Sequence, residues 1–145
     1  MSEFEQVEIL LVEDSARDAE LTMRALKKGG LANKLLWVKD GQEALDYLFD
    51  ANRALPAIVL LDLRLPRVSG LEVLKRMRAD PIRKLVPVVI LTSSKDESDI
   101  INGYSLGANS YIRKPVDFHN FVEAVAQLGM YWLVLNEAPP AAAPA

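Results

Sequence analysis

Cysteine is absent from this sequence of 145 residues, which excludes a disulfide framework and any thiolate chemistry. No apolar run is long enough to span a bilayer, and the first five residues lack the basic and apolar regions of a secretory signal. An excess of basic charge is also missing, because 17 basic and 20 acidic residues give a net charge of −3. We therefore expect a soluble, cytoplasmic protein that binds neither a membrane nor nucleic acid.

The residues that are present describe one globular domain. Hydrophobic residues make up 50% of the chain and charged residues 26%, proportions typical of a folded protein of this length. We predict the folded domain over residues 6–130 and a helical extension over 131–137. The Ala- and Pro-rich tail over 138–145 is expected to be disordered.

Short apolar segments alternate with segments of helical periodicity along the domain. The predicted strands cover residues 7–12, 34–38, 57–62, 88–92 and 111–113. The predicted helices cover 16–28, a segment that follows the turn at Asp40-Gly41, a segment from Ser69, about 96–107 and a segment from about 117. Strand 57–62 has no polar residue before its last position, which is typical of a parallel strand buried on both faces. The alternation predicts an α/β fold with a parallel sheet.

Three details of the helices can be predicted from local sequence. Ser15 is placed to cap the helix over 16–28. The second helix should bury Ala44, Leu45 and Leu48, and the third helix should bury Leu71, Leu74 and Met77.

Polar residues of a particular kind follow the ends of four predicted strands. Glu13 and Asp14 follow the first strand, Asp62 ends the third, Thr92 ends the fourth and Lys114 follows the fifth. Each is ordinary alone, but parallel strands share a direction, so all five should converge on one edge of the sheet. Three clustered carboxylates repel one another unless a cation joins them, and oxygen ligands without histidine or cysteine suit Mg²⁺. Lysine and threonine supply the charge and the hydroxyl donor that phosphoryl oxygens require.

Several motifs together resemble the receiver domain of two-component response regulators. The resemblance rests on Glu13-Asp14, the Asp62–Gly70 loop, Leu91-Thr92-Ser93, Gly107-Ala108 and Tyr111-Ile112-Arg113-Lys114-Pro115. It implies a flavodoxin-like (βα)5 fold with strand order 2-1-3-4-5. It also implies signalling through a phosphoryl group received from a sensor histidine kinase.

The resemblance implies a role for each matched residue. Asp62 is the expected phosphoacceptor, and Thr92 and Lys114 are expected to bind the phosphoryl oxygens. Tyr111 is the expected switch aromatic that follows a shift of Thr92, and Lys114-Pro115 is expected to be a cis peptide. The expected ligands of Mg²⁺ are Glu13 through water, Asp14, Asp62 and the backbone carbonyl of Arg64.

Two positions depart from the usual pattern of the family. Arg64 stands where a smaller or neutral residue is common, and Ser94 lies at the second variable position. In this family both positions influence how fast the aspartyl phosphate hydrolyses. His119, the single histidine, lies away from the strand ends and is expected to be a surface residue without a role in phosphotransfer.

Further details resemble the single-domain receivers that are paired with bacterial phytochrome kinases. They are the Glu13-Asp14 opening, the segment Leu45-Asp46-Tyr47-Leu48-Phe49 and the aromatic-aliphatic end of the last helix. Self-catalysed phosphotransfer turns over no separate substrate, so we do not expect an ordinary enzyme.

Three other functions compete with this interpretation. A phosphatase of the haloacid dehalogenase type also uses an aspartate nucleophile, but it needs a second acid where Arg64 stands. A flavin or nucleotide binder would want a phosphate-binding loop after the first strand, where Glu13 and Asp14 would repel a phosphate. A receiver-shaped interaction module that is never phosphorylated is disfavoured by the complete set of residues.

The end of the predicted last helix indicates a homodimer. A continuous apolar run there cannot face a single core, and Trp and Tyr are typical interface anchors. The predicted contact residues are Met130, Tyr131, Trp132, Leu133 and Leu135.

Overall fold

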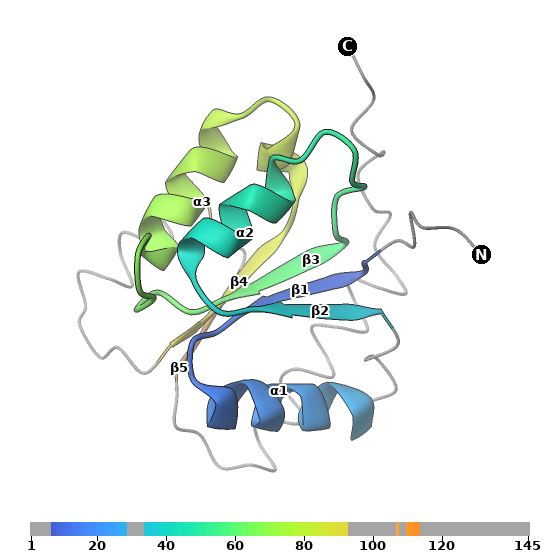
Figure 1. Ribbon diagram of the computed structural model, residues 1–145, viewed down its shortest axis with the longest axis vertical. Coiled ribbons are helices and arrows are strands. Elements are labelled where there is room, and N and C mark those ends of the chain that lie inside the picture. The colour runs from blue at the N-terminus through green and yellow to red at the C-terminus, as the bar shows by residue number, and fades with distance from the viewer. Residues whose placement is uncertain (1–6, 29–33, 93–106, 108–109, 114–145) are drawn as a thin grey trace.

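The structure, a computed structural model, describes residues 7–28, 34–92, 107 and 110–113. Within these ranges the first four strands alternate with helices (Figure 1). In chain order the elements are β1 (Ile9–Val12), α1 (Ala16–Lys28), β2 (Leu35–Val38), α2 (Gly41–Leu48), β3 (Ile58–Leu61), α3 (Gly70–Ala79), the 3-10 helix η1 (Arg83–Leu85), β4 (Val88–Thr92) and β5 (Ser110–Arg113). The helices predicted over 96–107 and from about 117, and the predicted cis peptide at Lys114-Pro115, lie outside the described residues, apart from Gly107.

The strands form one parallel sheet in the order β2-β1-β3-β4-β5. Val12 of β1 is in register with Val38 of β2 and with Leu61 of β3, so these three strands end at the same edge. The predicted fold class and strand order are confirmed. The first three strands were predicted slightly too long, since Val7 and Lys34 precede β1 and β2, and β3 ends one residue before Asp62. The fifth was predicted one residue too short, since β5 begins at Ser110.

Helices cover both faces of the sheet, with α2 and α3 on one face and α1 on the other (Figure 1). Side chains alternate along each strand, so Leu10 and Val59 pack with α2 and α3, while Ile9 and Leu60 pack with α1. Burial of both faces explains why the inner strands are continuous apolar runs.

The helix starts follow the predicted capping chemistry. The Ser15 Oγ accepts a hydrogen bond from the backbone N–H of Asp18 at 3.2 Å, which confirms the predicted cap of α1. The Ser69 Oγ does the same for the N–H of Glu72 in α3, also at 3.2 Å. These caps set where each helix begins after the carboxyl ends of the strands.

The buried faces of the helices agree with prediction for α2 and differ by one position for α3. Ala44, Leu45 and Leu48 of α2 are all buried. In α3 the residues at the core are Gly70, Val73, Leu74 and Met77, whereas Leu71 is only partly buried. Counting from Gly70, the core positions recur after three, four and seven residues, which leaves Leu71 at the margin of the stripe.

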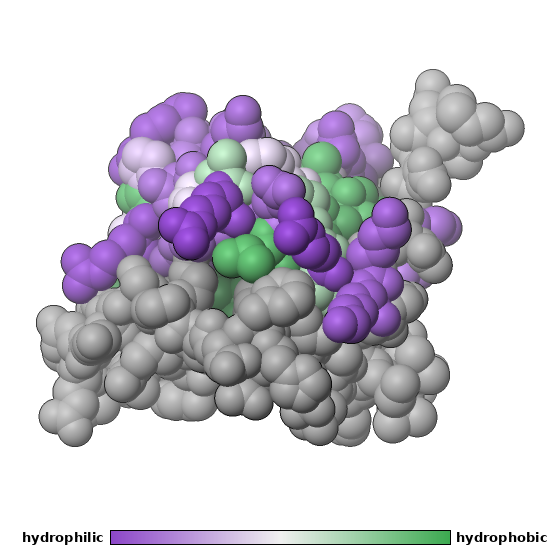
Figure 2. Space-filling model, turned by 90° about the horizontal axis from the view of Figure 1, so that it is seen from below, coloured by the Kyte–Doolittle hydropathy of each residue, from purple (hydrophilic) through white to green (hydrophobic). Residues whose placement is uncertain are grey.

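One face of the molecule is mainly polar where its residues are described (Figure 2). Figure 2, a view from below, shows mostly hydrophilic residues on the described part of that face, with hydrophobic residues visible between them. Among the described helices, none is long and apolar enough to cross a membrane.

Candidate functional site

Three carboxylates gather where β1 and β3 end. Glu13 and Asp14 follow β1, and Asp62 follows the neighbouring strand β3. One carboxylate oxygen from each residue lies within 4.8 Å of the other two. Glu13 and Asp62 are buried, with 1% and 6% of their surfaces exposed, whereas Asp14 is exposed. The predicted convergence of these three side chains is confirmed.

Glu13 is held by contacts from two neighbouring segments. Its backbone N–H donates to the carbonyl oxygen of Val38 at 3.1 Å, which continues the β1–β2 ladder past the last residue of β1. The Glu13 Oε2 accepts the N–H of Ser15 at 3.2 Å. The indole Nε1 of Trp37 donates to the Glu13 carbonyl oxygen at 2.7 Å. The turn after β1 is therefore fixed by the sheet, by the start of α1 and by one side chain of β2.

Asp62 is held by the sheet and by the loop that follows it. Its backbone N–H donates to the carbonyl oxygen of Val12 at 3.0 Å. Its Oδ1 accepts the N–H of Arg64 at 3.1 Å, which turns the chain back over the carboxylate. The loop closes where the N–H of Gly70 donates to the carbonyl oxygen of Leu63 at 2.9 Å.

Gly70 is required by the close approach of this loop to α3. A Cβ at this position would lie 2.1 Å from the Asp62 carbonyl oxygen and 2.6 Å from the Leu63 Cα. Backbone atoms cannot yield to such a contact as a flexible side chain would. Only glycine therefore lets α3 begin directly against the backbone of Asp62.

The cluster has the chemistry of a site for a hard divalent cation. Carboxylate oxygens are the ligands that Mg²⁺ takes in proteins, usually one or two of them with waters and phosphate oxygens. Bringing the negative charges of Glu13, Asp14 and Asp62 together is unfavourable unless a cation neutralises them. The donor set therefore fits Mg²⁺ or a similar ion, with Glu13, Asp14 and Asp62 as the residues that would hold it.

Comparison with known protein families identifies the domain that carries this carboxylate cluster. The family model described as the response regulator receiver domain matches residues 9–126, a range that includes the ends of β1 and β3 and the loop between β3 and α3. The chain belongs to this family. The alternative of a haloacid dehalogenase phosphatase is left without support.

The relatives of this receiver domain include regulators associated with phytochromes. The probable methanogenesis regulatory protein FilR2 of Methanothrix harundinacea is 42% identical over 134 residues, which cover 90% of this chain and 86% of FilR2. The phosphorylated cyanobacterial phytochrome response regulator RcpA has a similar structure, with a TM-score of 0.82, 36% identity and coverage of 93% of this chain and 99% of RcpA. The Mn²⁺-bound form of the response regulator Rcp1 gives a TM-score of 0.81 and 35% identity, over 91% of this chain and 98% of Rcp1.

The other predicted residues of the receiver site are described in part or not at all. Thr92 is the last residue of β4, and its backbone is in register with Arg113 of β5. Tyr111 is in register with Ile90. Lys114 lies outside the described residues, as do the predicted dimer contacts Met130, Tyr131, Trp132, Leu133 and Leu135. The roles predicted for these residues stay predictions, as does a metal contact from the Arg64 carbonyl.

Two supporting residues of the receiver site were missed by sequence reasoning. Trp37 contacts Glu13 from 24 residues away, and nothing in its local pattern indicates that contact. Gly70 was interpreted only as a loop marker, although it sits one residue after the α3 cap Ser69, where a good helix former would be expected. A close approach of two backbone segments could have been inferred from the glycine at that position.

Proposed function

We propose that this receiver domain accepts a phosphoryl group on Asp62 from a sensor histidine kinase. The observation that carries the proposal is the cluster of Glu13, Asp14 and Asp62 at the carboxyl edge of the sheet. Asp62 is the member of the cluster that directly follows β3, at the start of the loop closed by Gly70. The phosphorylated state of the relative RcpA also supports the proposal.

The proposed transfer is a displacement at phosphorus. A carboxylate oxygen of Asp62 forms a bond to the phosphorus atom as the phosphorus–nitrogen bond of a kinase phosphohistidine breaks, and the imidazole nitrogen keeps the electron pair. Glu13, Asp14, Asp62 and the carbonyl of Arg64 would hold Mg²⁺, which neutralises charge on the phosphoryl oxygens when bound. Thr92 and Lys114 would bind those oxygens. The protein modifies itself in this step and turns over no separate substrate.

The expected output is a change of surface rather than a chemical product. Phosphorylation of Asp62 adds roughly two negative charges and three acceptor oxygens beside the sheet edge. Thr92 at the end of β4 would move toward these oxygens, and Tyr111 on the neighbouring β5 would follow into the vacated space. Partner binding or onward transfer of the phosphoryl group would read this change. The family to which the chain belongs acts in two-component signalling, which makes a cytoplasmic setting the natural one.

A phytochrome-type kinase is the phosphodonor that the relatives favour. RcpA, a phytochrome response regulator, matches nearly its whole length to this chain. FilR2, by contrast, is a probable regulator of methanogenesis, so the relatives do not all point to a phytochrome. The phytochrome-type donor is therefore a separate proposal from phosphorylation of Asp62 itself. The test is transfer of label from purified phytochrome-type kinases and, separately, from other purified histidine kinases. The cognate kinase should phosphorylate the chain fastest.

The acceptor is tested by labelling with acetyl phosphate in the presence of Mg²⁺. Asp62→Asn should abolish labelling, because the amide cannot form the acyl phosphate, while the control Asp46→Asn on the exposed side of α2 should label like the wild type. Labelling is measured by intact-protein mass spectrometry. Equal labelling of Asp62→Asn and wild type would contradict the proposal, and absence of labelling in the wild type would favour the alternative of an interaction module that is never phosphorylated.

The same proposal includes a homodimer formed by the end of the last predicted helix. The support is the apolar run of the sequence, with Trp132 and Leu133 at its centre. Changing Trp132 and Leu133 to charged residues should convert dimers to monomers in sedimentation experiments without phosphate. A wild-type chain that sediments as a monomer at tens of micromolar would contradict this part of the proposal.

A further inference from the structure

The loop between β3 and α3 contains a strained turn close to the proposed acceptor. Arg67 has a φ of 68°, in the left-handed region that residues other than glycine rarely adopt. The N–H of Val68 donates to the carbonyl oxygen of Pro66 at 2.8 Å, so Arg67 is the central residue of a γ-turn with positive φ. Turns of this kind are rare and strained, and they persist where surrounding contacts hold them.

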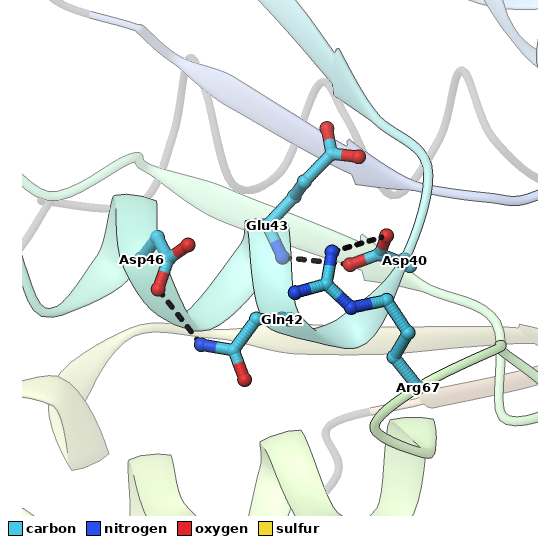
Figure 3. A network of polar contacts seen from close by, with 5 residues as sticks. All are labelled: Asp40, Gln42, Glu43, Asp46 and Arg67. Carbon is cyan, nitrogen blue, oxygen red and sulfur yellow. Dashed lines mark hydrogen bonds and ion pairs between the residues drawn. The ribbon is translucent and has the colours of Figure 1, made fainter.

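One side-chain contact holds this turn from the start of α2 (Figure 3). The Arg67 Nη1 donates to the Asp40 Oδ2 at 3.3 Å, across 27 residues of sequence. The other oxygen of the same carboxylate, Oδ1, accepts the N–H of Glu43 at 2.8 Å and caps α2. Figure 3 shows Arg67 reaching from its loop to the carboxylate of Asp40 at the beginning of that helix. A single carboxylate therefore joins α2 to the loop after β3.

A backbone contact holds the same loop one residue further on. A Cβ on Gly41 would lie 1.9 Å from the carbonyl oxygen of Val68, so the first residue of α2 packs directly against the loop backbone. The two contacts involve consecutive residues on each side, Asp40 with Gly41 and Arg67 with Val68. Together they form a clamp between the start of α2 and the loop that leaves Asp62.

We propose that Arg67 is a positioning residue of the receiver site. Its ion pair with Asp40, beside the Gly41–Val68 contact, holds the strained loop in place and so holds the backbone of Arg64, which contacts Asp62, in the arrangement that binds a divalent cation. This inference rests on the proposed function, because it concerns the same carboxylate cluster. Arg67 touches neither the cation nor the phosphoryl group in this role; it acts through the loop.

An ordinary surface ion pair would have no such effect. Exposed pairs of this kind contribute little to stability, and the Arg67 side chain is 61% exposed. The Asp40 side chain, however, is only 11% exposed and is already oriented by its hydrogen bond to Glu43. The partner of Arg67 is thus fixed in advance, so less conformational freedom is lost when the pair forms. The strained backbone at Arg67 is a second reason to expect that the ion pair with Asp40 has a structural role, because a strained turn persists only where contacts hold it.

The experiment compares Arg67→Ala with Arg67→Lys and with the control Arg76→Ala. Arg76 is a suitable control because its side chain is also exposed and forms an ion pair at 3.0 Å with Glu72, a residue of the same helix α3. Two properties are measured: amide hydrogen exchange of residues 63–70 in the metal-free protein, and the Kd for Mn²⁺ by calorimetry. Neither requires phosphorylation. Thermal unfolding is recorded for every variant so that loss of the fold is recognised.

We expect Arg67→Ala to exchange faster over 63–70 and to bind Mn²⁺ with a Kd raised roughly tenfold, the low end of what loss of a group that orients metal ligands causes. Arg67→Lys, which keeps the charge, should recover most of both properties. Arg76→Ala should match the wild type in both. The labelling rate with acetyl phosphate should fall in the same order as the affinity for Mn²⁺.

A second variant separates the clamp from the helix cap. Asp40→Asn keeps an oxygen that can accept the N–H of Glu43 but removes the charge that Arg67 contacts. We expect Asp40→Asn to raise the Kd for Mn²⁺ about as much as Arg67→Ala, and the double variant to be no worse than either, because one interaction is lost in all three.

The outcomes separate this inference from the proposed function. If the wild type binds Mn²⁺ and is labelled while Arg67→Ala equals it in exchange and affinity, the inference is overturned and the proposed function stands. Equal losses in Arg67→Ala and Arg76→Ala would also overturn it. If the wild type binds Mn²⁺ but is not labelled, the exchange and affinity data still test the inference, and only the proposed function fails. A wild type that binds no Mn²⁺ would overturn both.

Discussion

The turn after β1 and the loop after β3 carry acidic side chains to the same edge of the sheet, but over different lengths of chain. Residues 13–15 connect β1 to α1, whereas residues 62–69 connect β3 to α3. In the short turn, Glu13 bonds to Ser15, and Ser15 caps the helix that follows. In the long loop, the chain depends on contacts with α2 and on the approach of Gly70 to Asp62.

This difference indicates where each region is vulnerable. Most contacts of the short turn lie within a few residues of sequence or continue the sheet, so a single surface change there should cost stability without displacing a carboxylate. The long loop has a left-handed residue and two close backbone approaches, which leave little space for a changed side chain. Changes at these close approaches should therefore affect the site more than they affect the fold. Three predictions test this comparison.

The largest effect is expected for Gly70→Ala. The added methyl group would meet the Asp62 carbonyl oxygen, so α3 and the loop must separate. We expect labelling by acetyl phosphate to fall roughly 100-fold, as for a misplacement of about 1 Å in a catalytic site. The free energy of unfolding should fall by about 1–3 kcal/mol. Chemical denaturation and the labelling rate measure the two quantities.

Ser69→Ala is the matched control for Gly70→Ala. It removes the α3 cap next to Gly70 and should cost about 1 kcal/mol of stability without obstructing Asp62. If both variants lose labelling in proportion to their loss of stability, Gly70 has no effect on the site beyond its effect on the stability of the fold, and the comparison is wrong.

A smaller effect, on stability alone, is expected for Ser15→Ala in the short turn. The variant loses the side-chain hydrogen bond to the N–H of Asp18, worth about 1 kcal/mol in such caps. Glu13 should stay in place, because its backbone bond to Val38 and its contact with Trp37 remain. The affinity for Mn²⁺ should equal that of the wild type. A clear loss of affinity would mean that the short turn depends on its helix as strongly as the long loop depends on α2.

The smallest effect is a dependence of stability on pH at the clamp. The hydrogen bond from the Glu43 N–H, aided by the nearby Arg67, holds the pKa of Asp40 below its ordinary value. A lowered carboxyl pKa stabilises the fold above the pKa of the unfolded chain, and this contribution is lost as pH falls through the folded pKa. The difference in Tm between wild type and Asp40→Asn should therefore be constant near neutral pH and shrink below about pH 4. A difference that grows on acidification would contradict this assignment.

Much of the site could be predicted because it depends on local rules. An apolar strand that ends in an acid, repeated along an alternating pattern, places Glu13 and Asp62 at one edge whenever the strands are parallel. The cap at Ser15 is equally local, since it needs only a hydroxyl three residues before an N–H. The roles predicted for Lys114 and for the apolar run around Trp132 concern residues outside the described ranges and stay predictions.

The contacts that hold these carboxylates could not be read from the pattern of residues. Trp37 reaches Glu13 from a neighbouring strand, and Arg67 reaches Asp40 across 27 residues, because packing of strands and helices brings distant backbone segments together. From the sequence Gly70 is predicted only to mark a loop. The folded structure shows that the Asp62 carbonyl oxygen leaves no space for a side chain at this position. The alternation of side chains and the direction of a strand depend on a few neighbouring residues. The sequence alone therefore predicts that the acidic residues after β1 and β3 lie at one edge of the sheet. Distances between segments depend on how the whole chain packs, so the clamp and the close approaches emerge only in the folded protein.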